Sequence, residues 1–375
     1  MPNESYYYTG VITDNANQNI YEFIGCCIYK TQISTNATSR VFGVTPCGNQ
    51  CSTYDPFSNK ICSITDYMYS NTTNILYFGQ GINGFCINGP VISSINLNTF
   101  VVTTIYTFPT GTTLRITSLP GIYFVPSALC KDDLQANIFY AILTGFNIAS
   151  TQLMGKILVS IDISTQNITY IAGDPYVYSP NFVSKDGYGM GASFTSGEAG
   201  GQICQVLSGT IYILDAVNNI IRQVFPSTSL SLTYIGNSSC SSVYPGYKTS
   251  ACFSQSVGLS YIPQLNIFIT GGFQNPSLSI FKGNDNGFVA VTNGGNCNGY
   301  TRGAVGFVSA SYYPAFNSIV LGNSYSEVWK FTIDLTSINA TYAPNPPPLP
   351  PWPPQKNAPP MPPPSPNPAG RRMKR

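Results

Sequence analysis

Short apolar runs recur along this chain in quartets, and this periodicity constrains the fold more than any other feature. Each run mixes β-branched and aromatic residues over five to seven positions and is bounded by Gly, Asn, Asp or Ser, which is typical of β-strands. We therefore predict six sheets of four antiparallel strands. One run type marks the repeat at six places: NIYEFIG (19–25), NILYFGQ (74–80), NIFYAIL (137–143), TIYILDA (210–216), NIFITGG (266–272) and NSIVLGN (317–323).

A closed ring is the arrangement that buries both faces of each of these sheets. A four-stranded sheet has two faces and cannot bury both alone, whereas sheets stacked face to face around an axis bury each face against a neighbour. The sequence thus predicts an all-β, six-bladed β-propeller over 1–343, built without one large core. The last run, INATY (338–342), gives the sixth blade its own outer strand. We expect the ring to close by packing between its first and last blades.

One stretch, Asn167 to Phe225, carries a more specific signature. Its order of I-A-G, D-G-x-G-x-x-A-x-F and I-Y-I-x-D-x-x-N-x-I-R resembles the NHL repeat, and that resemblance implies a β-propeller. It also implies that five residues brace the turns between strands, with ligand binding as the alternative role: Asp186, Asp215, Asn218, Asn219 and Arg222. Lyases with this ring hold zinc through histidines, and six-bladed lactonases and esterases hold calcium through acids and Asn.

The absence of histidine removes several chemistries. A Ser-His-Asp triad, a Cys-His pair and a histidine-held zinc cannot form, and no Walker or Rossmann signature occurs. On the predicted inner strands the only clear acids are Asp14 and Asp66, which leaves a two-carboxylate calcium site as a minor alternative. We predict no catalytic residue, no metal site and no cofactor.

Charge argues against nucleic acid. The chain holds 17 basic and 15 acidic residues, and five of the basic ones follow Pro344. The body therefore carries 17 − 5 = 12 basic against 15 acidic residues, a net charge of −3. A body of this charge offers no electrostatic footprint for a phosphate backbone.

Eleven cysteines without histidine favour disulfides over zinc and indicate an oxidising compartment. Cys240 and Cys252 bracket a short loop and are the best candidate pair, while Cys47, Cys51 and Cys62 can supply one more bridge. The odd count leaves one thiol free or joined to another chain. Other cysteines in strand runs, such as Cys204, are interpreted as buried small hydrophobes.

Several features bear on location. No apolar run reaches the roughly 18 residues that a spanning helix needs, so we predict no membrane span. Met1 opens onto PNESYYY without a signal-peptide pattern, so a secretory signal would have been removed or would lie outside this chain. We expect an extracellular or cell-surface protein. Six sequons permit N-glycosylation without proving export: Asn3, Asn36, Asn71, Asn167, Asn237 and Asn339.

The segment 344–375 has 15 prolines and a basic end, and it is predicted to form an extended polyproline II tail. It serves either as a stiff spacer or as a ligand segment that docks on a neighbouring subunit. Its composition is similar to the hydroxyproline-rich, pherophorin-like wall glycoproteins, which implies O-glycosylation. Candidate docking or O-glycosylation positions are Pro346, Pro347, Pro348, Trp352, Pro362, Pro363, Pro364 and Ser365.

Two functions are compatible with these observations. The first is a non-catalytic, extracellular structural or adhesive glycoprotein, a propeller head on a proline rod that assembles through propeller–tail contacts, with itself, other matrix proteins or glycans as partners. The alternative is a propeller enzyme or a small-ligand or glycan receptor that uses the central channel or the rim of long loops. These loops are expected at 46–61, 108–118, 174–201, 237–256 and 294–304. An apolar plug in the channel would favour the first function.

Overall fold

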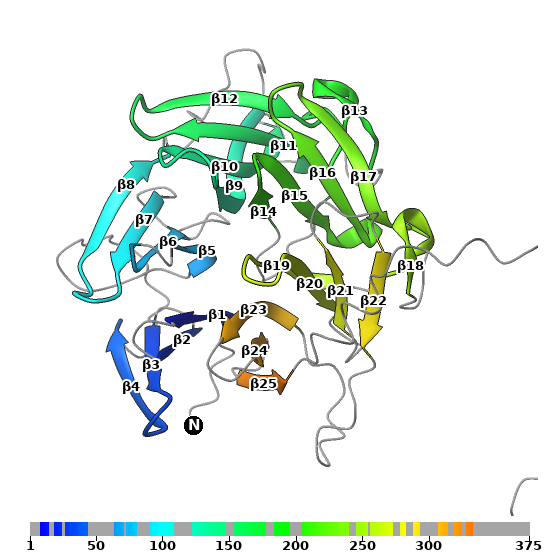
Figure 1. Cartoon of the computed structure of the whole chain (residues 1–375). Helices are drawn as coiled ribbons and strands as arrows, with labels where there is room; N and C mark the ends of the chain where they lie inside the picture. The colour runs from blue at the N-terminus through cyan, green and yellow to red at the C-terminus, as the bar shows by residue number, and fades with distance from the viewer. Residues whose placement is uncertain are drawn as a thin grey trace, which may run out of the picture. The chain divides into compact units, whose positions relative to one another are not determined.

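The computed structural model describes the chain in segments, and every strand of these segments belongs to an antiparallel sheet (Figure 1). The described residues are 8–14, 19–24, 27–43, 64–70, 73–80, 91–108, 122–147, 153–177, 184–195, 204–239, 245–253, 256–272, 278–282, 288–292, 307–313, 318–323 and 328–332. The prediction of an all-β chain is confirmed.

The first three sheets each contain four consecutive strands, paired in sequence order. The innermost strand comes first in each sheet, so the chain runs from the centre outwards. The strands of the first sheet are β1 (Tyr8–Asp14), β2 (Asn19–Ile24), β3 (Cys27–Gln32) and β4 (Ala37–Phe42). Those of the second are β5 (Ile64–Ser70), β6 (Ile75–Gln80), β7 (Val91–Asn96) and β8 (Val102–Thr107). Those of the third are β9 (Ile122–Lys131), β10 (Ile138–Asn147), β11 (Leu153–Asp162) and β12 (Asn167–Ala172).

The next two sheets add a short outer strand to the same four-stranded pattern. The fourth sheet contains β14 (Cys204–Leu207), β15 (Thr210–Asp215), β16 (Ile220–Phe225) and β17 (Leu230–Gly236), and β13 (Gly187–Tyr188) pairs with its outer strand β17. The fifth contains β19 (Ser256–Ile262), β20 (Ile267–Gly272), β21 (Leu278–Lys282) and β22 (Phe288–Thr292), and β18 (Gly246–Tyr247) pairs with its outer strand β22. The last sheet comprises β23 (Phe307–Tyr313), β24 (Ser318–Asn323) and β25 (Val328–Thr332).

The structure therefore shows a β-propeller with five four-stranded blades, not the six that the sequence predicted. The sixth quartet of apolar runs contributes a sheet of three strands among the described residues. Its expected outer strand at 338–342 lies outside them. The sequence predicted a sixth sheet because the first three of these runs have the composition of strands. Composition does not show whether the fourth run pairs with the third and completes the sheet.

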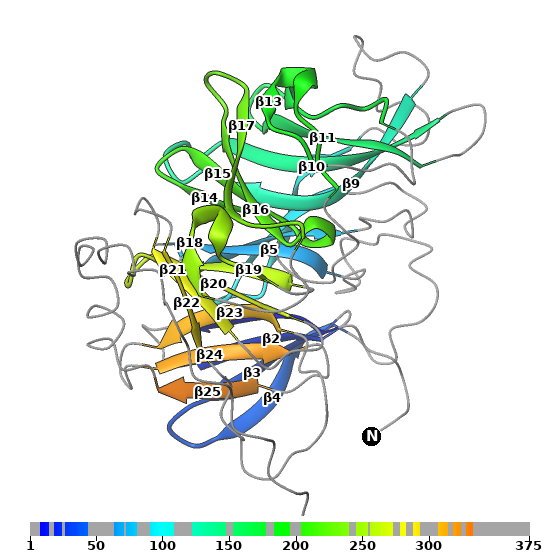
Figure 2. The same ribbon diagram turned by 90° about the vertical axis from the view of Figure 1, so that its right-hand side faces the viewer.

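The inner strands form a closed ring, because each one contacts the inner strands of the two neighbouring sheets. β1 contacts β5, β5 contacts β9, β9 contacts β14, β14 contacts β19, β19 contacts β23, and β23 contacts β1 (Figures 1 and 2). Side-chain hydrogen bonds join the first and last sheets. The Thr13 backbone NH donates to Ser311 Oγ at 3.0 Å, and the Thr13 hydroxyl donates to the Tyr312 carbonyl at 2.7 Å. Packing and hydrogen bonds thus connect the two ends of the ring.

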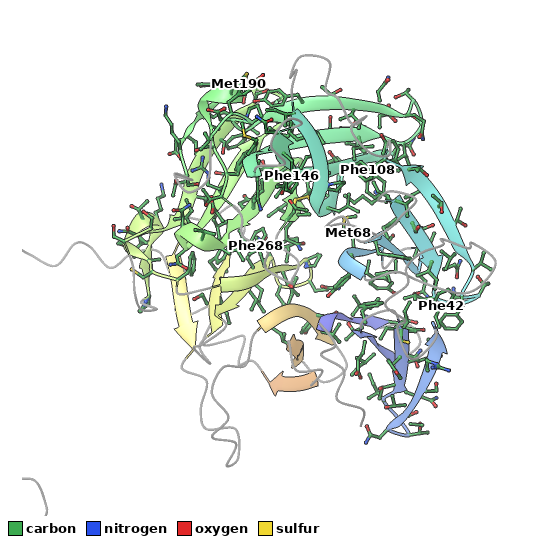
Figure 3. The ribbon with its side chains drawn as sticks, turned by 180° about the vertical axis from the view of Figure 1, so that it is seen from behind. Phe42, Met68, Phe108, Phe146, Met190 and Phe268 are labelled. Atoms are coloured by element: carbon green, nitrogen blue, oxygen red, sulfur yellow. A yellow bond between two sulfur atoms is a disulfide. The ribbon has the colours of Figure 1, made fainter. Side chains whose placement is uncertain are left out.

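Aromatic side chains fill the layers between neighbouring sheets. Tyr212 of the fourth sheet lies 4.7 Å from Phe268 of the fifth, measured between ring centroids, and Phe268 stacks on Phe281 at 5.0 Å. Phe108 fills the layer between the second and third sheets (Figure 3). Because each sheet is apolar on both faces, burying these faces drives closure of the ring.

A GYxxxAxF segment precedes the fourth and the fifth sheets and anchors each to the blade before it. In both copies the Gly-Tyr pair forms the outer strand, a short 3-10 turn follows, and the Phe is buried: Phe194 in the first copy and Phe253 in the second. Each Phe packs against a glycine with positive φ at the end of the preceding blade, Gly173 or Gly236. The sequence analysis recognised only the first copy.

Replacing Gly236 by alanine is expected to destabilise the fold by about 1 to 3 kcal/mol. Its φ is +100°, and an added Cβ would lie 2.4 Å from the Asn219 carbonyl oxygen and 2.9 Å from a ring carbon of Phe253. Urea unfolding followed by fluorescence measures the change. Gly191→Ala is the matched control, because a Cβ there meets nothing within 4 Å. Equal losses in the two variants would contradict this account.

Contacts divide the chain into two units, Met1–Asp334 and Leu335–Arg375. The predicted boundary between 343 and 344 lies outside the described residues, as does the whole proline-rich segment, so the tail conformation and its docking positions stay predictions. Within the described part of the chain, no helix has the length and apolar character needed to cross a membrane.

Candidate functional site in the central channel

A cavity of about 450 Å³ occupies the centre of the ring. Side chains from the inner strands of all six sheets line it, together with Tyr77 of β6 and the residues that follow β9 and β19. One representative from each inner strand is Thr13, Tyr69, Lys131, Gln205, Tyr261 and Ser311. The channel thus contains polar side chains where a structural head would be expected to carry an apolar plug.

The cavity lies at the carboxyl ends of the inner strands. Tyr69 and Ser70 end β5, Lys131 ends β9, and Pro263 directly follows β19. From these ends the chain turns into the second strand of each sheet, so the cavity lies at the rim formed by these tight connections, here called the hairpin rim. The rim of long loops, the other predicted place for binding, lies at the opposite ends of these strands, and most of its residues fall outside the described ones.

Two channel tyrosines, in the second and fifth sheets, are each held by a hydrogen bond to an asparagine side chain. The Tyr69 hydroxyl donates to Asn74 Oδ1 at 2.9 Å, and the Tyr261 hydroxyl donates to Asn266 Oδ1 at 3.1 Å. Both asparagines have left-handed backbone angles, with φ of 53° and 51°, which Asn tolerates better than most residues. Each phenol oxygen keeps lone pairs that can accept a hydrogen bond from a ligand.

Two carboxylates beside the channel were missed by the sequence analysis. Asp132 is buried and accepts the backbone NH groups of Leu134 and Gln135 at 2.7 and 2.9 Å and the Tyr140 hydroxyl at 2.5 Å. Asp133 accepts the NH groups of Ser208 and Gly209 in the next blade at 2.6 and 3.0 Å. Both follow the last residue of β9, so they lie at the end of an inner strand and not within it. The sequence signal was the run LCKDD at the end of an apolar segment.

Lys131 brings an amine to the same wall. Its Nζ lies 5.9 Å from the ring centroids of both Tyr77 and Phe139 and donates to the Asp132 carbonyl at 3.2 Å. Burial lowers the pKa of the Lys131 ammonium, and the charges of Asp132 and Asp133 oppose part of this shift. The site thus combines one amine, two anchored carboxylates and several phenols.

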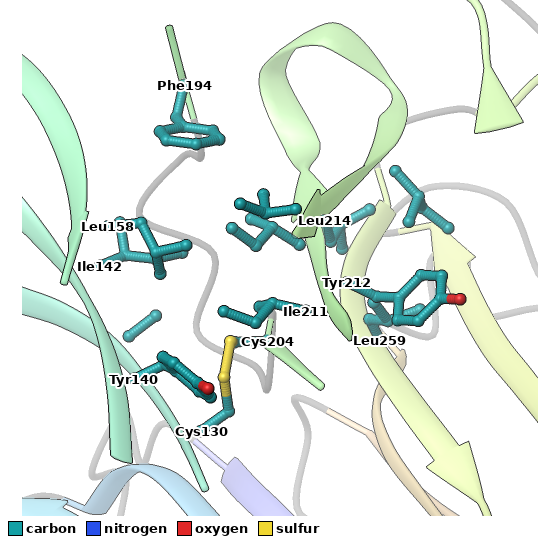
Figure 4. Packing of buried hydrophobic residues seen from close by; sticks show 14 of the residues in the cluster. Cys130, Tyr140, Ile142, Leu158, Phe194, Cys204, Ile211, Tyr212, Leu214 and Leu259 are labelled. Carbon is teal, nitrogen blue, oxygen red and sulfur yellow. A yellow bond between two sulfur atoms is a disulfide. The ribbon is translucent and has the colours of Figure 1, made fainter. Parts of the chain in front are cut away.

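A disulfide joins β9 to β14 at the channel wall (Figure 4). It links Cys130 to Cys204, whose Cα atoms lie 5.5 Å apart. The interpretation of Cys204 as a buried small hydrophobe is therefore wrong, because its sulfur is bonded across the blade interface. Cys252 is also disulfide-bonded. Its proposed partner Cys240, like Cys47, Cys51 and Cys62, lies outside the described residues, so that pairing stays a prediction.

The NHL-like residues gather elsewhere, at the outer half of the fourth sheet. Arg222 is fully buried and forms an ion pair with Asp186, with 2.9 Å between Nη1 and Oδ1. Its Nη2 donates to the Lys185 carbonyl at 2.6 Å and to Ser231 Oγ at 3.0 Å. The guanidinium therefore ties residues 185 and 186, directly before the GYxxxAxF segment, to strands β16 and β17.

Asp215 is the second centre of this network and is also fully buried. It accepts the Ser184 hydroxyl at 2.6 Å, the Thr195 NH at 3.1 Å, and hydrogen bonds from the Thr195 hydroxyl and from Asn218. Asn219 ends the 3-10 turn η3 (Ala216–Asn218) with a φ of 52°. None of the five NHL-like residues lines the channel cavity, so their role as braces remains our interpretation of these contacts.

Other predicted positions are scattered. Asn36 lies in an exposed turn, Asn167 is exposed at the start of β12, and Asn237 is half-buried after β17, while Asn3, Asn71 and Asn339 lie outside the described residues. Asp14 is buried in β1, and the side chain of Asp66 is not among those described. Within the described segments, no group of three or more Cys, Asp or Glu side chains could hold a metal ion.

Sequence comparison finds no relative: no family model matches the chain, and no curated protein does. Structure comparison finds many similar folds. A protein of unknown function from Bacteroides thetaiotaomicron aligns with 86% of this chain and 68% of its own, at 12% identity and a TM-score of 0.54. A luciferin-regenerating enzyme aligns over 88% of both chains at 8% identity and a TM-score of 0.46. A streptogramin B lyase covers 88% of this chain and 94% of its own, at 8% identity and 0.47.

At such identities these likenesses support the fold alone, a β-propeller. The prediction that the chain is a non-catalytic structural or adhesive glycoprotein is corrected, because an apolar plug was the feature expected of a structural head. The cavity is lined instead by polar side chains from every inner strand together with apolar ones. We therefore discard the structural assignment and examine the alternative, a propeller that acts on or binds a small molecule.

Proposed function

We propose that this protein binds a small, neutral, hydroxyl-bearing molecule in its central channel. The observation that carries this proposal is the cavity of about 450 Å³ with polar side chains from all six inner strands. Ligand pockets commonly measure about 300 to 1,000 Å³ and combine apolar walls with a few polar groups that fix orientation. The cavity therefore suits a ligand the size of a mono- or disaccharide.

The chemistry of the wall supports this ligand class. Tyr69 and Tyr261 present phenol oxygens held in place by Asn74 and Asn266, and Tyr77 adds a ring face. The carboxylates of Asp132 and Asp133 are oriented by backbone NH groups, and the Lys131 ammonium on the same wall offsets part of their negative charge. Aromatic faces beside hydroxyl partners suit sugars, whose rings carry apolar CH faces and polar edges.

Saturation-transfer NMR with a panel of mono- and disaccharides tests the proposal. We expect at least one member to bind and its signal to fall in Gln264→Trp, because Gln264 is exposed at the hairpin rim and lines the cavity. Val101→Trp is the matched control, since Val101 is 59% exposed and does not line the cavity. No binding by any sugar, or equal binding by both variants, would overturn the proposal.

We further propose that the protein works outside the cell or on its surface. The Cys130–Cys204 disulfide supports this location, because such bonds persist in oxidising compartments. The exposed sequon residues Asn36 and Asn167 are available to glycosylation there. Mass spectrometry of native material would detect these glycans, and finding Cys130 and Cys204 reduced in freshly isolated protein would tell against the location.

A further inference from the structure

We propose that Lys131 forms an imine with an aldehyde or ketone ligand in the channel, an inference that rests on the proposed binding function. It narrows the substrate class to hydroxyl-bearing carbonyl compounds, of which an open-chain reducing sugar is one example. Lys131 lines the cavity at the end of β9, where the inner strand reaches the hairpin rim. A ligand that enters at this rim meets the amine directly.

The surroundings hold the amine in place. Its Nζ lies 5.9 Å from the Tyr77 and Phe139 ring centroids and donates a hydrogen bond to the Asp132 carbonyl at 3.2 Å. That bond uses one of the three N–H directions of an ammonium. Among the described residues, neither Asp132 nor Asp133 forms an ion pair with this amine within 4.0 Å. The amine is thus positioned without being neutralised by a salt bridge.

The reaction balances without an added oxidant or reductant. The neutral amine adds its lone pair to the carbonyl carbon, a proton passes from nitrogen to oxygen, and a carbinolamine forms. Protonation of its hydroxyl breaks the C–O bond, water leaves, and loss of the remaining N–H proton gives the imine. One amine and one carbonyl compound therefore yield one imine and one water.

The channel supplies groups for these proton transfers. Burial raises the pKa of Tyr77, so this phenol stays protonated at neutral pH and can donate a hydrogen bond to the carbonyl oxygen. The hydroxyl groups of Tyr69 and Tyr261 donate to Asn74 and Asn266, so their oxygens can accept a hydrogen bond from a hydroxyl group of the ligand. Burial lowers the pKa of Lys131, which increases the neutral fraction of the amine at a given pH. Asp132, Asp133 and the phenol of Tyr140 are the other titratable groups on this wall and its adjacent strand.

Reductive trapping with glyceraldehyde and cyanoborohydride tests the inference. Peptide mapping after brief reaction at pH 7 should show modification of Lys131 at least about tenfold faster than that of the exposed Lys185 and Lys248, because the channel holds the carbonyl compound beside this amine. Lys131→Arg keeps the charge and should lose the rapid modification while leaving that of Lys185 unchanged.

The outcomes separate this inference from the proposed binding function. If sugars bind and Gln264→Trp blocks them, but lysines react in order of exposure, the imine proposal is wrong and binding stands. If no sugar binds but Lys131 is trapped selectively and Gln264→Trp blocks trapping, the imine proposal stands and the ligand class shifts to smaller carbonyl compounds. Equal labelling of Lys131, Lys185 and Lys248, together with no binding of any sugar, overturns both the imine proposal and the binding proposal.

Discussion

Replacing Arg222 by methionine is expected to destabilise the protein by about 3 to 5 kcal/mol, the usual cost of removing one partner from a buried charge network. The side chain is fully buried and donates to the Lys185 carbonyl and to Ser231. Methionine fills much of the same volume, so the loss reports mainly on the broken network and not on a cavity. Asp215 would stay buried with the nearest positive charge removed.

The Asp186 carboxylate, which is 48% exposed, provides a control for the buried part of the network. Asp186→Asn removes the ion-pair partner while the other hydrogen bonds of Arg222 stay, so the loss should stay below about 1 kcal/mol. Urea unfolding measures both variants. A loss at Arg222 no larger than that at Asp186 would show that burial does not decide the effect.

The sequence predicted the parts of this fold that depend on local pattern. The runs at 19–25 and 210–216 mix β-branched and aromatic residues beside Gly, Asn or Asp, and both contain strands where expected. The blade count was less secure, because the repeat of run types does not show whether the last run, at 338–342, pairs with β25. Strand identity is a local property, whereas completion of a sheet depends on contacts made after folding.

The candidate site could not be predicted in the same way. Lys131, Gln205 and Tyr261 lie far apart in the sequence and meet only because their inner strands surround one channel. The second GYxxxAxF segment, GYKTSACF, lacks the Asp that precedes the first copy. The repeat consensus therefore did not identify it, although its Phe253 occupies the same buried place as Phe194.

The disulfide between Cys130 and Cys204 escaped prediction for a related reason. Its cysteines are separated by 74 residues, and each lies within an apolar run that reads as an ordinary strand. Sequence spacing favours pairs that bracket a short loop, such as Cys240 and Cys252. A bond between inner strands of neighbouring blades requires the ring itself to bring the two sulfurs together.

Removing this bond with the double change Cys130→Ala and Cys204→Ala is expected to destabilise the protein by about 4 kcal/mol. In the chain-entropy model the stabilisation grows from about 3 kcal/mol for a 15-residue loop to about 4.7 for 100 residues, and this loop closes over a separation of 74. Both cysteines are buried in the same core, so alanine avoids leaving unpaired hydroxyls there. Urea unfolding under non-reducing conditions measures the change.

The double variant is a sharper test than reduction of the native protein. Cys252 is disulfide-bonded as well, so a reductant would break more than one bond and the losses could not be separated. In the double variant only the link between β9 and β14 is absent, and adding reductant to it then reports on the remaining bonds. Cys130 adjoins Lys131, so the same variant also tests whether the channel wall depends on this bond. Selective trapping of Lys131 should weaken if β9 separates from β14. A variant as stable as the native chain would mean that packing of the inner strands alone closes this part of the ring.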